Sequence, residues 1–395
     1  MLSLSQTSSF IPKKVRCYIT DNKRLFLPLL LLVALVVPTT REFTLQALSD
    51  AFFQVSVFVA ATLLIYYYLI DRLPQLQLSY LRAKSGILEV SFASILGALP
   101  GCGGAIIVVT QFTKKQASFG SVVAVLTATM GDAAFLLLAT RPLDGLLMML
   151  IGVAVGVISG QLVNTFHKAD KFQPDEASEY TEPPQCQPSA LKFSRPVWKL
   201  ALVPSLIVAF VIATNTDLSV FGNSVNQGIT LFGSIMALFT VVVWALSSKG
   251  SSYKQVTSEE APCTPPSKLT KVLMDTHFVT AWVVASFMLF EILVNLAGIN
   301  LSVWFSDYAY LAPLVAVAIG LLPGCGPQIV VMTLYIQGII PFSAMAANAI
   351  SNDGDALFPA IALAPKAALM ATVYSTIPAL LFGYGLYFYG ISFLL

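Results

Sequence analysis

The chain has 395 residues, of which 56% are hydrophobic and 11% are charged. Soluble domains carry about 25% charged residues, so the composition excludes an ordinary soluble globule and predicts an all-α polytopic membrane protein. The net charge of +2 gives no sign of a nucleic-acid partner, and we expect none.

The N-terminal region carries a basic stretch, Lys13 to Arg24, ahead of an apolar run over 25–37. Secretory signal peptides have the same order. Here, however, the basic stretch is long, and the residues after the run, Pro38 to Arg41, form no small-residue cleavage site. We therefore expect a retained first helix.

Apolar segments then recur along the chain on the length scale of a membrane span, about 20 residues. They run roughly over 24–40, 51–70, 87–112, 118–140, 143–164, 198–214, 227–247, 277–297, 309–340, 343–363 and 366–393. Two polar loops, 165–197 and 248–275, separate a first transmembrane repeat (1–164), connecting helices (198–247) and a second repeat (276–395).

An internal duplication lies within these segments. Leu99-Pro100-Gly101-Cys102-Gly103 recurs as Leu322-Pro323-Gly324-Cys325-Gly326, and Gly131-Asp132 recurs at the same offset as Gly354-Asp355. Over 97–142 against 320–365, 17 of the 46 ungapped pairs are identical. In transporters, interrupted apolar segments at corresponding positions of two halves indicate the substrate site.

Basic residues indicate how the two interrupted segments lie in the membrane. If both turn back as re-entrant hairpins, 20 of the 22 Lys and Arg fall on the cytoplasmic side, and only Arg41 and Arg141 lie outside. If both segments cross, the count is 10 inside and 12 outside. The positive-inside rule favours hairpins. The resulting model has nine spanning helices, two hairpins entering from opposite faces, inverted repeats and an external C-terminus.

Each hairpin tip predicts a cavity, because broken backbone at membrane depth is tolerated only inside protein or beside water. Carbonyl groups at such a turn suit cations and amide groups suit anions, so the turn leaves the sign of the substrate open. The residues at or flanking the tips that we expect to contact substrate are Cys102, Gly103, Thr110, Cys325, Gly326 and Gln328.

Carboxylates in the following segments sharpen this prediction. Asp132 and Asp355 lie near the middle of their apolar segments, where a charge is costly and indicates function by default. Asn352 and Asp353 belong to a run of small and oxygen-bearing residues, 351–355, which suggests an unwound helix lining the same cavity. The alternative is that these aspartates only cap broken half-helices.

The role of the two cysteines stays open at this stage. Cysteine between glycines can simply be a packing residue. If the thiols do bind, thiolate with carboxylate suits a soft or borderline metal or a thiophilic metalloid, whereas oxygen ligands alone suit manganese. The candidate metal ligands are Asp132, Asp353, Asp355, Cys102 and Cys325. The five cysteines of the chain have no C-x-x-C spacing, so we expect free thiols.

Energy for transport is expected to come from an ion gradient, because the sequence has no nucleotide-binding P-loop. The coupling ion would be a proton or sodium. Candidate proton-coupling residues are Asp132, Asp355 and Glu291, although Glu291 could equally be a hydrogen-bonded structural group. The two histidines have no credible catalytic partners, so we expect neither an enzyme nor a cofactor.

The motifs at 97–103, 320–326 and 351–355 together resemble those of the ten-transmembrane heavy-metal exporter family. This family is related by name to the arsenic permeases and is also described as manganese transporters. The resemblance implies a multi-pass permease of the bacterial inner membrane.

Our leading expectation is an ion-coupled secondary transporter that exports a metal or metalloid ion, such as manganese or an arsenical. The alternative is a cation-coupled transporter of organic anions or amino acids, in which hairpin amides bind a carboxylate. A homodimer is left open.

Overall fold

A computed structural model of the chain describes residues 23–167, 171–173, 189–214, 222–247, 267–297, 309–322 and 324–389. Every regular element among these residues is helical, which confirms the predicted all-α class. Most of the two polar loops, and with them Cys186 and Cys263, lies outside the described residues, as does Cys17.

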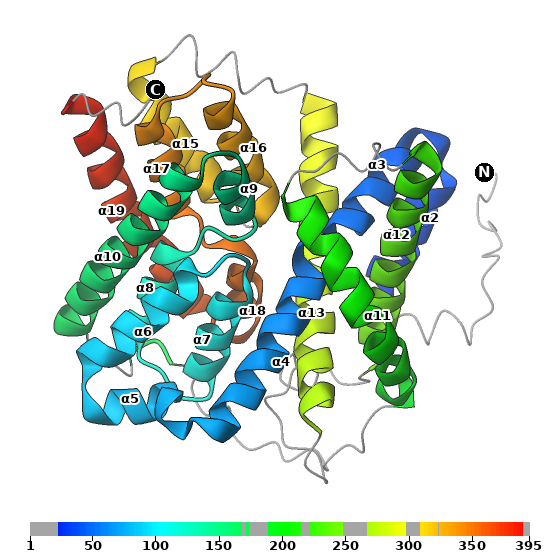
Figure 1. The fold of residues 1–395 in the computed structure, drawn as a ribbon, viewed down its shortest axis with the longest axis horizontal. Helices are drawn as coiled ribbons and strands as arrows, with labels where there is room; N and C mark the ends of the chain where they lie inside the picture. Colours follow the sequence, from blue (N-terminus) through cyan, green and yellow to red (C-terminus); the bar gives the residue numbers. More distant parts are fainter. Residues whose placement is uncertain are drawn as a thin grey trace, which may run out of the picture.

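Short connections join the successive helices of the first half of the chain (Figure 1). They are α2 (Phe26–Val36), α3 (Pro38–Asp50), the π-helical turn η2 (Ala51–Ser56), α4 (Val57–Arg72), α5 (Leu78–Lys84), α6 (Gly86–Ala98), α7 (Gly103–Thr113), α8 (Phe119–Ala128), α9 (Ala133–Thr140) and α10 (Pro142–Phe166).

The second half contains the connecting helices and the second copy of the duplication. Its helices are α11 (Ser189–Ala213), α12 (Asn223–Leu246), α13 (Lys268–Ala297), α15 (Ala312–Gly320), α16 (Cys325–Ile336), α17 (Phe342–Ser351), α18 (Leu357–Leu363) and α19 (Pro365–Phe388). Short 3₁₀ turns are η1 (Lys23–Leu25), η3 (Pro74–Leu76), η5 (Ala309–Leu311) and η6 (Gly354–Ala356).

Two groups of helices lie side by side in Figure 1. One group holds α2, α3, α11, α12 and α13, and the other holds α6 to α10 with α15 to α19. Helix α4 runs between them and contacts α7 of the second group as well as α11 and α13 of the first. Both interrupted segments therefore belong to the same group.

Seven helices of the described residues are long and apolar enough to cross a membrane. They are Pro38–Arg72, Phe119–Thr140, Pro142–Phe166, Leu191–Ala213, Asn223–Leu246, Lys268–Leu289 and Pro365–Phe388. The nine spans expected from the sequence and these seven candidate spans differ at two places. Segment 24–40 contains only the 11-residue α2 before Pro38 begins α3. Segment 343–363 is divided into α17 and α18 by an unwound stretch.

No single helix of the two interrupted segments is long enough to cross alone. Helix α6 has 13 residues and α7 has 11, which correspond to about 20 Å and about 17 Å against an apolar core of about 30 Å. Helices α15 and α16, with 9 and 12 residues, are equally short. In Figure 1 the α6–α7 pair lies in the lower half and the α15–α16 pair in the upper half. The inverted relation of the two repeats stays a prediction.

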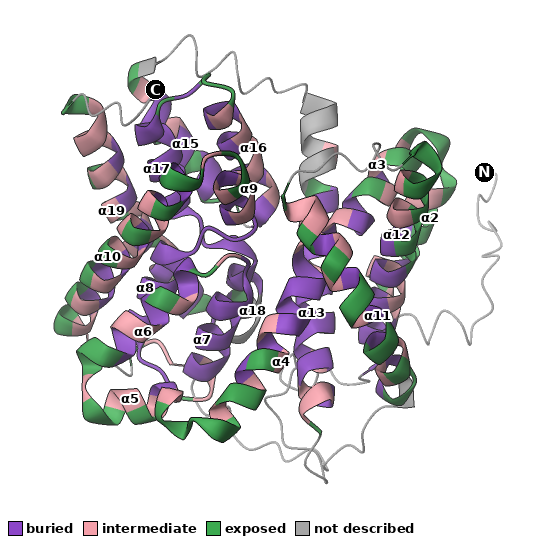
Figure 2. Cartoon of the chain, in the orientation of Figure 1, coloured by how far each residue is buried: buried purple, intermediate pink, exposed green. Residues whose placement is uncertain are grey.

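Burial separates interior helices from outer ones (Figure 2). All ten residues of α8 and all ten of α17 are buried, as are the first ten of α7. Helices α10, α11 and α19 instead expose large apolar side chains, such as Leu150, Leu200 and Leu381. A surface of this kind suits lipid, whereas α7, α8 and α17, which border the breaks, are enclosed by protein, as unpaired backbone at membrane depth requires.

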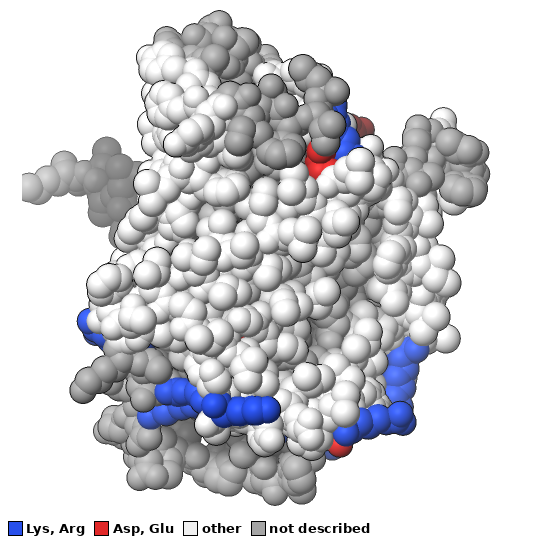
Figure 3. Space-filling view, turned by 60° about the vertical axis from the view of Figure 1, so that its left-hand side comes forward, with Lys and Arg blue, Asp and Glu red and all other residues white. Residues whose placement is uncertain are grey.

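Basic side chains gather at one end of the molecule, at the bottom of the face shown in Figure 3. Arg72 ends α4, Arg82 and Lys84 lie in the last turn of α5, and Lys268 begins α13 next to Asp71. We call this the basic end. Helix α9 and the start of α10 lie in the upper half of Figure 1, away from the basic end, and Arg141 joins these two helices.

Candidate metal centre

The tip of the first hairpin is built by a tight turn between α6 and α7. Leu99 leaves α6 in an extended conformation, and Gly101 has φ +92°, which a side chain would disfavour. The amide of Gly101 donates a hydrogen bond to the carbonyl of Gly131, at 2.9 Å. The tip is thereby fixed to the break between α8 and α9, with Cys102 immediately before α7.

The second copy uses the same kinds of residue. Gly324, with φ +113°, precedes α16, and Cys325 is the first residue of that helix. Between α17 and α18 the backbone unwinds, and the amide of Gly354 donates to Oδ1 of Asn352 at 2.7 Å. Asp132 follows the first unwound stretch and Asp355 lies within the second, in η6.

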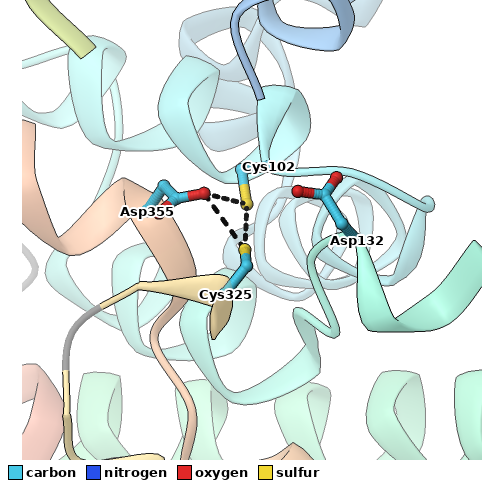
Figure 4. Close-up of side chains that lie close together, drawn as sticks. All are labelled: Cys102, Asp132, Cys325 and Asp355. Carbon is cyan, nitrogen blue, oxygen red and sulfur yellow. Dashed lines mark hydrogen bonds between the residues drawn. The ribbon is translucent and has the colours of Figure 1, made fainter. Parts of the chain in front are cut away.

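Four ligand-bearing side chains converge where these tips and unwound stretches meet (Figure 4). The sulfur atoms of Cys102 and Cys325 lie 3.3 Å apart. Oδ2 of Asp355 lies 3.4 Å from the first sulfur and 3.0 Å from the second. With Asp132 included, the four ligand atoms all lie within 4.8 Å of one another. Figure 4 shows the two carboxylates on opposite sides of the sulfur pair.

The cluster is buried but its polar atoms are incompletely paired. Asp355 and Cys325 are 0% exposed, and Asp132 is 7% exposed. Within the described residues, neither carboxylate oxygen of Asp132 has a hydrogen-bond partner, nor has Oδ1 of Asp355. Among the described residues, neither carboxylate forms an ion pair. A buried unpaired carboxylate is costly, and a bound cation would remove that cost.

The separations suit a small ion with four ligands. A tetrahedral ion with metal–sulfur bonds of about 2.3 Å places two thiolates about 3.8 Å apart. The separations among the two sulfur atoms and Oδ2 of Asp355 are 3.0–3.4 Å, somewhat shorter than this value, so a bound ion would move these three atoms slightly apart. Two sulfur and two oxygen ligands form a set that soft and borderline metals accept.

Two glycines, Gly131 and Gly354, lie next to the thiols, where a larger residue would crowd the sulfur atoms. At Gly131, φ +51°, a β carbon would lie 2.6 Å from Sγ of Cys325 and 3.3 Å from Sγ of Cys102. At Gly354, φ +58°, a β carbon would lie 3.5 Å from Sγ of Cys102. Each glycine thus contacts the thiol of the other repeat. The sequence shows both Gly-Asp pairs, but it gives no signal that their glycines contact sulfur.

The remaining predicted site residues divide into near and distant ones. Gln328 is close: its buried amide has no partner at either atom, and Oε1 lies 3.6 Å from the β carbon position of Gly131. Asn352 shapes the second unwound stretch, and its Nδ2 is also unpartnered. Gly103 packs against Thr62 of α4. Gly326 lies in the first turn of α16, next to Cys325.

Three predicted residues are not placed at the cluster. The carboxylate of Asp353 instead accepts hydrogen bonds from Thr372 and, at 3.3 Å, from Ser375, both in α19. Thr110 lies two turns along α7 from Cys102, so it is distant from the tip. Glu291 belongs to α13, and its side chain lies outside the part of the structure that is described.

One residue that the sequence analysis missed, Thr129, lies at the cluster. Its buried Oγ1 has no partner, and its methyl group lies 3.6 Å from the β carbon position of Gly354. Thr129 occupies the position that Asn352 holds in the second copy. That alignment is the signal that identifies it.

Comparison with known proteins gives a single kind of match. The model of the family described as "Putative, 10TM heavy-metal exporter" matches residues 39–390. No curated protein and no solved structure matches the chain. The family match spans both hairpins, both unwound stretches and the connecting helices. The chain therefore belongs to this ten-transmembrane heavy-metal exporter family.

Proposed function

We propose that the protein is an ion-coupled secondary transporter that exports a thiophilic metal or metalloid ion across the bacterial inner membrane. The observation that carries this proposal is the convergence of Cys102, Asp132, Cys325 and Asp355 within 4.8 Å. Each repeat supplies one thiol and one carboxylate to the same buried point. The family supports a heavy-metal cargo, and the ligand chemistry narrows it.

Sulfur in the ligand set favours one of the two expected kinds of cargo. Manganese prefers carboxylate, carbonyl and water oxygens, whereas thiolates select softer ions. A pair of thiols 3.3 Å apart suits cadmium, zinc or a trivalent arsenical. Manganese would use Asp132 and Asp355 with the side-chain oxygens of Gln328 or Thr129, and would leave the sulfur atoms without a role.

Transport needs the ligands to change their protonation or ion occupancy in step with the cargo. Thiols and carboxyl groups must both lose their protons to bind a metal, so metal binding releases protons. Because Asp132 and Asp355 are among the proposed ligands, a proton gradient could be coupled to transport directly through their carboxyl groups. Sodium coupling, and a part for Glu291, are separate proposals that the same transport assay distinguishes. A homodimer stays a prediction.

The alternative cargo, an organic anion, meets an obstacle at the cluster. Asp132 and Asp355 are both buried beside the point that a substrate carboxylate would occupy. When ionised, they would repel it. The starts of α7 and α16 could offer amide groups to an anion only if a cation first neutralised these aspartates.

The decisive experiment measures transport by purified protein in liposomes loaded with cadmium, manganese, arsenite or an organic anion. We expect cadmium or arsenite to move under an imposed pH gradient. Movement of an organic anion alone would overturn the metal proposal. Replacing the pH gradient by a sodium gradient identifies the coupling ion.

Paired cysteine variants locate the ligands. Cys102→Ser combined with Cys325→Ser should abolish movement of the thiophilic ion, while the protein still inserts in the membrane. The matched control replaces the other three cysteines, Cys17, Cys186 and Cys263, by serine and should retain transport. Full transport by the Cys102/Cys325 variant would show that the thiols only pack.

A further inference from the structure

A small pocket reaches the metal centre from one side. Its volume is about 140 Å³, and Asp132 and Gln54 lie on it together with apolar side chains of α4, α9, α11 and α16. The pocket therefore lies between the two groups of helices. It has room for several water molecules and contains two polar groups that could hold them.

The pocket lies in the half of the molecule away from the basic end. Arg195, in the first turns of α11, donates to Ser267 beside the start of α13, so α11 begins at the basic end. Ile212 and Ala213, which line the pocket, are the last residues of this 25-residue helix, about 35 Å further on. Leu136, also in the lining, lies between Asp132 and Arg141.

Asp132 connects the pocket with the cluster. Its carboxylate belongs to the four converging ligands and also lines the pocket. The side chain is 7% exposed, and neither oxygen has a hydrogen-bond partner. An ion held by Asp132 would therefore have a neighbouring space in which to regain water.

Gln54 reaches the pocket from an irregular part of the backbone. It lies in η2, a π-helical turn of six residues between α3 and α4. The hydroxyl of Ser56 donates to the carbonyl of Ala51 at 2.8 Å and contacts Thr280 of α13 at 2.7 Å. These contacts support a turn type that is rare and that frequently occurs at functional sites.

We infer that this pocket is the outward half of the ion's route and that Gln54 is the ligand that receives the ion from Asp132. The inference rests on the proposed function. A neutral amide oxygen binds a partly hydrated divalent cation less tightly than two thiolates and two carboxylates do, so the ion gains water there without being retained.

The first experiment tests access to position 54 from outside. Gln54→Cys is made in the protein whose Cys17, Cys186 and Cys263 are serine, and intact cells are treated with a charged, membrane-impermeant thiol reagent. We expect labelling from outside, slowed by cadmium. Ile207→Cys, on the exposed apolar face of α11, is the control and should stay unlabelled by the aqueous reagent. Labelling of position 54 from the inner face alone would overturn the inference.

The second experiment measures the contribution of the amide. Gln54→Leu should slow cadmium export by about tenfold, the loss expected for one interaction with a charged ligand of about 1.4 kcal/mol. Cadmium binding at the cluster, followed by the ultraviolet absorption of cadmium–thiolate bonds, should be unchanged. Gln46→Leu, on α3 and hydrogen-bonded to Asp50, is the matched control.

The two proposals fail in different ways. If the parent protein binds no cadmium through its thiols, the proposed function fails. If the parent protein binds and exports cadmium while Gln54→Leu exports it at the parent rate, only the route through the pocket fails.

Discussion

At the scale of single residues, the candidate metal centre brings together polar groups whose joint burial is unfavourable. Two carboxyl groups and two thiols lie in protein interior within 4.8 Å, and three of the four carboxylate oxygens have no partner. Burying charge without compensation costs several kcal/mol. A bound cation would compensate this cost, which is why atoms that are costly to bury together form a candidate ion site.

Gly131 allows a test that leaves all four ligands in place. In Gly131→Ala the new methyl group would lie 2.6 Å from Sγ of Cys325, so the thiol must move. Overpacking of this kind costs about 1–3 kcal/mol, and we expect cadmium binding to weaken by about tenfold or more. Binding is measured by titration of the purified protein.

Backbone strain at Gly131 needs its own control, because φ there is +51°. Gly338→Ala provides it: φ is +74°, and no atom lies within 4 Å of the added carbon. The two variants share the strain, and only the first should weaken cadmium binding. Equal loss in both would assign the effect to the backbone.

The sequence predicts which side chains converge at the candidate centre better than it predicts their neighbours. Cys102, Cys325, Asp132 and Asp355 occupy equivalent positions of the duplication, and in transporters such positions of two halves are where a substrate site is expected. The sequence does not predict where the side chain of Asp353 points, because an unwound stretch has no fixed period that sets the direction of each side chain. Two residues away from Asp355, its side chain turns to Thr372 of α19 instead. No spacing rule distinguishes these two directions.

At the scale of helices, a row of glycines on α10 determines how closely α8 packs against it. Gly152, Gly156 and Gly160 are spaced four apart on α10, where they allow the backbone of α8 to approach. A β carbon at Gly156 would lie 2.7 Å from the carbonyl oxygen of Ala124. Small residues at this spacing are the usual means of close helix contact in membranes. Because α8 leads to Asp132, this contact also positions the carboxylate.

Gly156→Ala should therefore destabilise the protein, by about 1–3 kcal/mol if α8 is forced away. The expected result is a lower midpoint in thermal unfolding of the detergent-solubilised protein, together with weaker cadmium binding. Gly385→Ala, in α19, adds a carbon with no neighbour within 4 Å and should leave the midpoint unchanged. An unchanged midpoint in Gly156→Ala would show that the two helices can separate without cost.

Helix boundaries show where sequence patterns fail at this scale. The apolar run over 24–40 looks like one span, yet Pro38 begins a separate helix that continues through η2 and α4 to Arg72. Proline is favoured in the first turn of a helix and disfavoured within one, so Pro38 marks the boundary. Polar residues such as Glu42 and Gln46 reduce the hydropathy of α3, which conceals its continuity with α4.

At the scale of the whole molecule, the distribution of basic residues gives the protein an orientation. Arg72, Arg82, Lys84 and Lys268 lie at the basic end, which the positive-inside rule assigns to the cytoplasm. The connection after α7, at Lys114 and Lys115, is predicted to lie at this end, and the corner before α10 at the other.

Site-directed labelling checks this orientation. A cysteine at Lys115 should react with an impermeant reagent in inverted membrane vesicles but not in intact cells, and a cysteine at Thr140 should show the reverse. Both positions are exposed in the structure. Reaction at position 115 in intact cells, with position 140 reacting only in inverted vesicles, would mean that the first interrupted segment crosses the membrane, and the inverted repeat would be lost.

The division of ligands between the two repeats also limits which ions can be cargo. Four ligands hold an ion far more tightly than two, so separating the α7 tip from the α16 tip would release the ion by ending its chelation. An ion that binds both thiols too strongly would keep the tips together and act as a cross-link. For such a transporter, the tightest ligand is an inhibitor, and good cargo is an ion of intermediate affinity whose bonds to Cys102 and Cys325 exchange quickly.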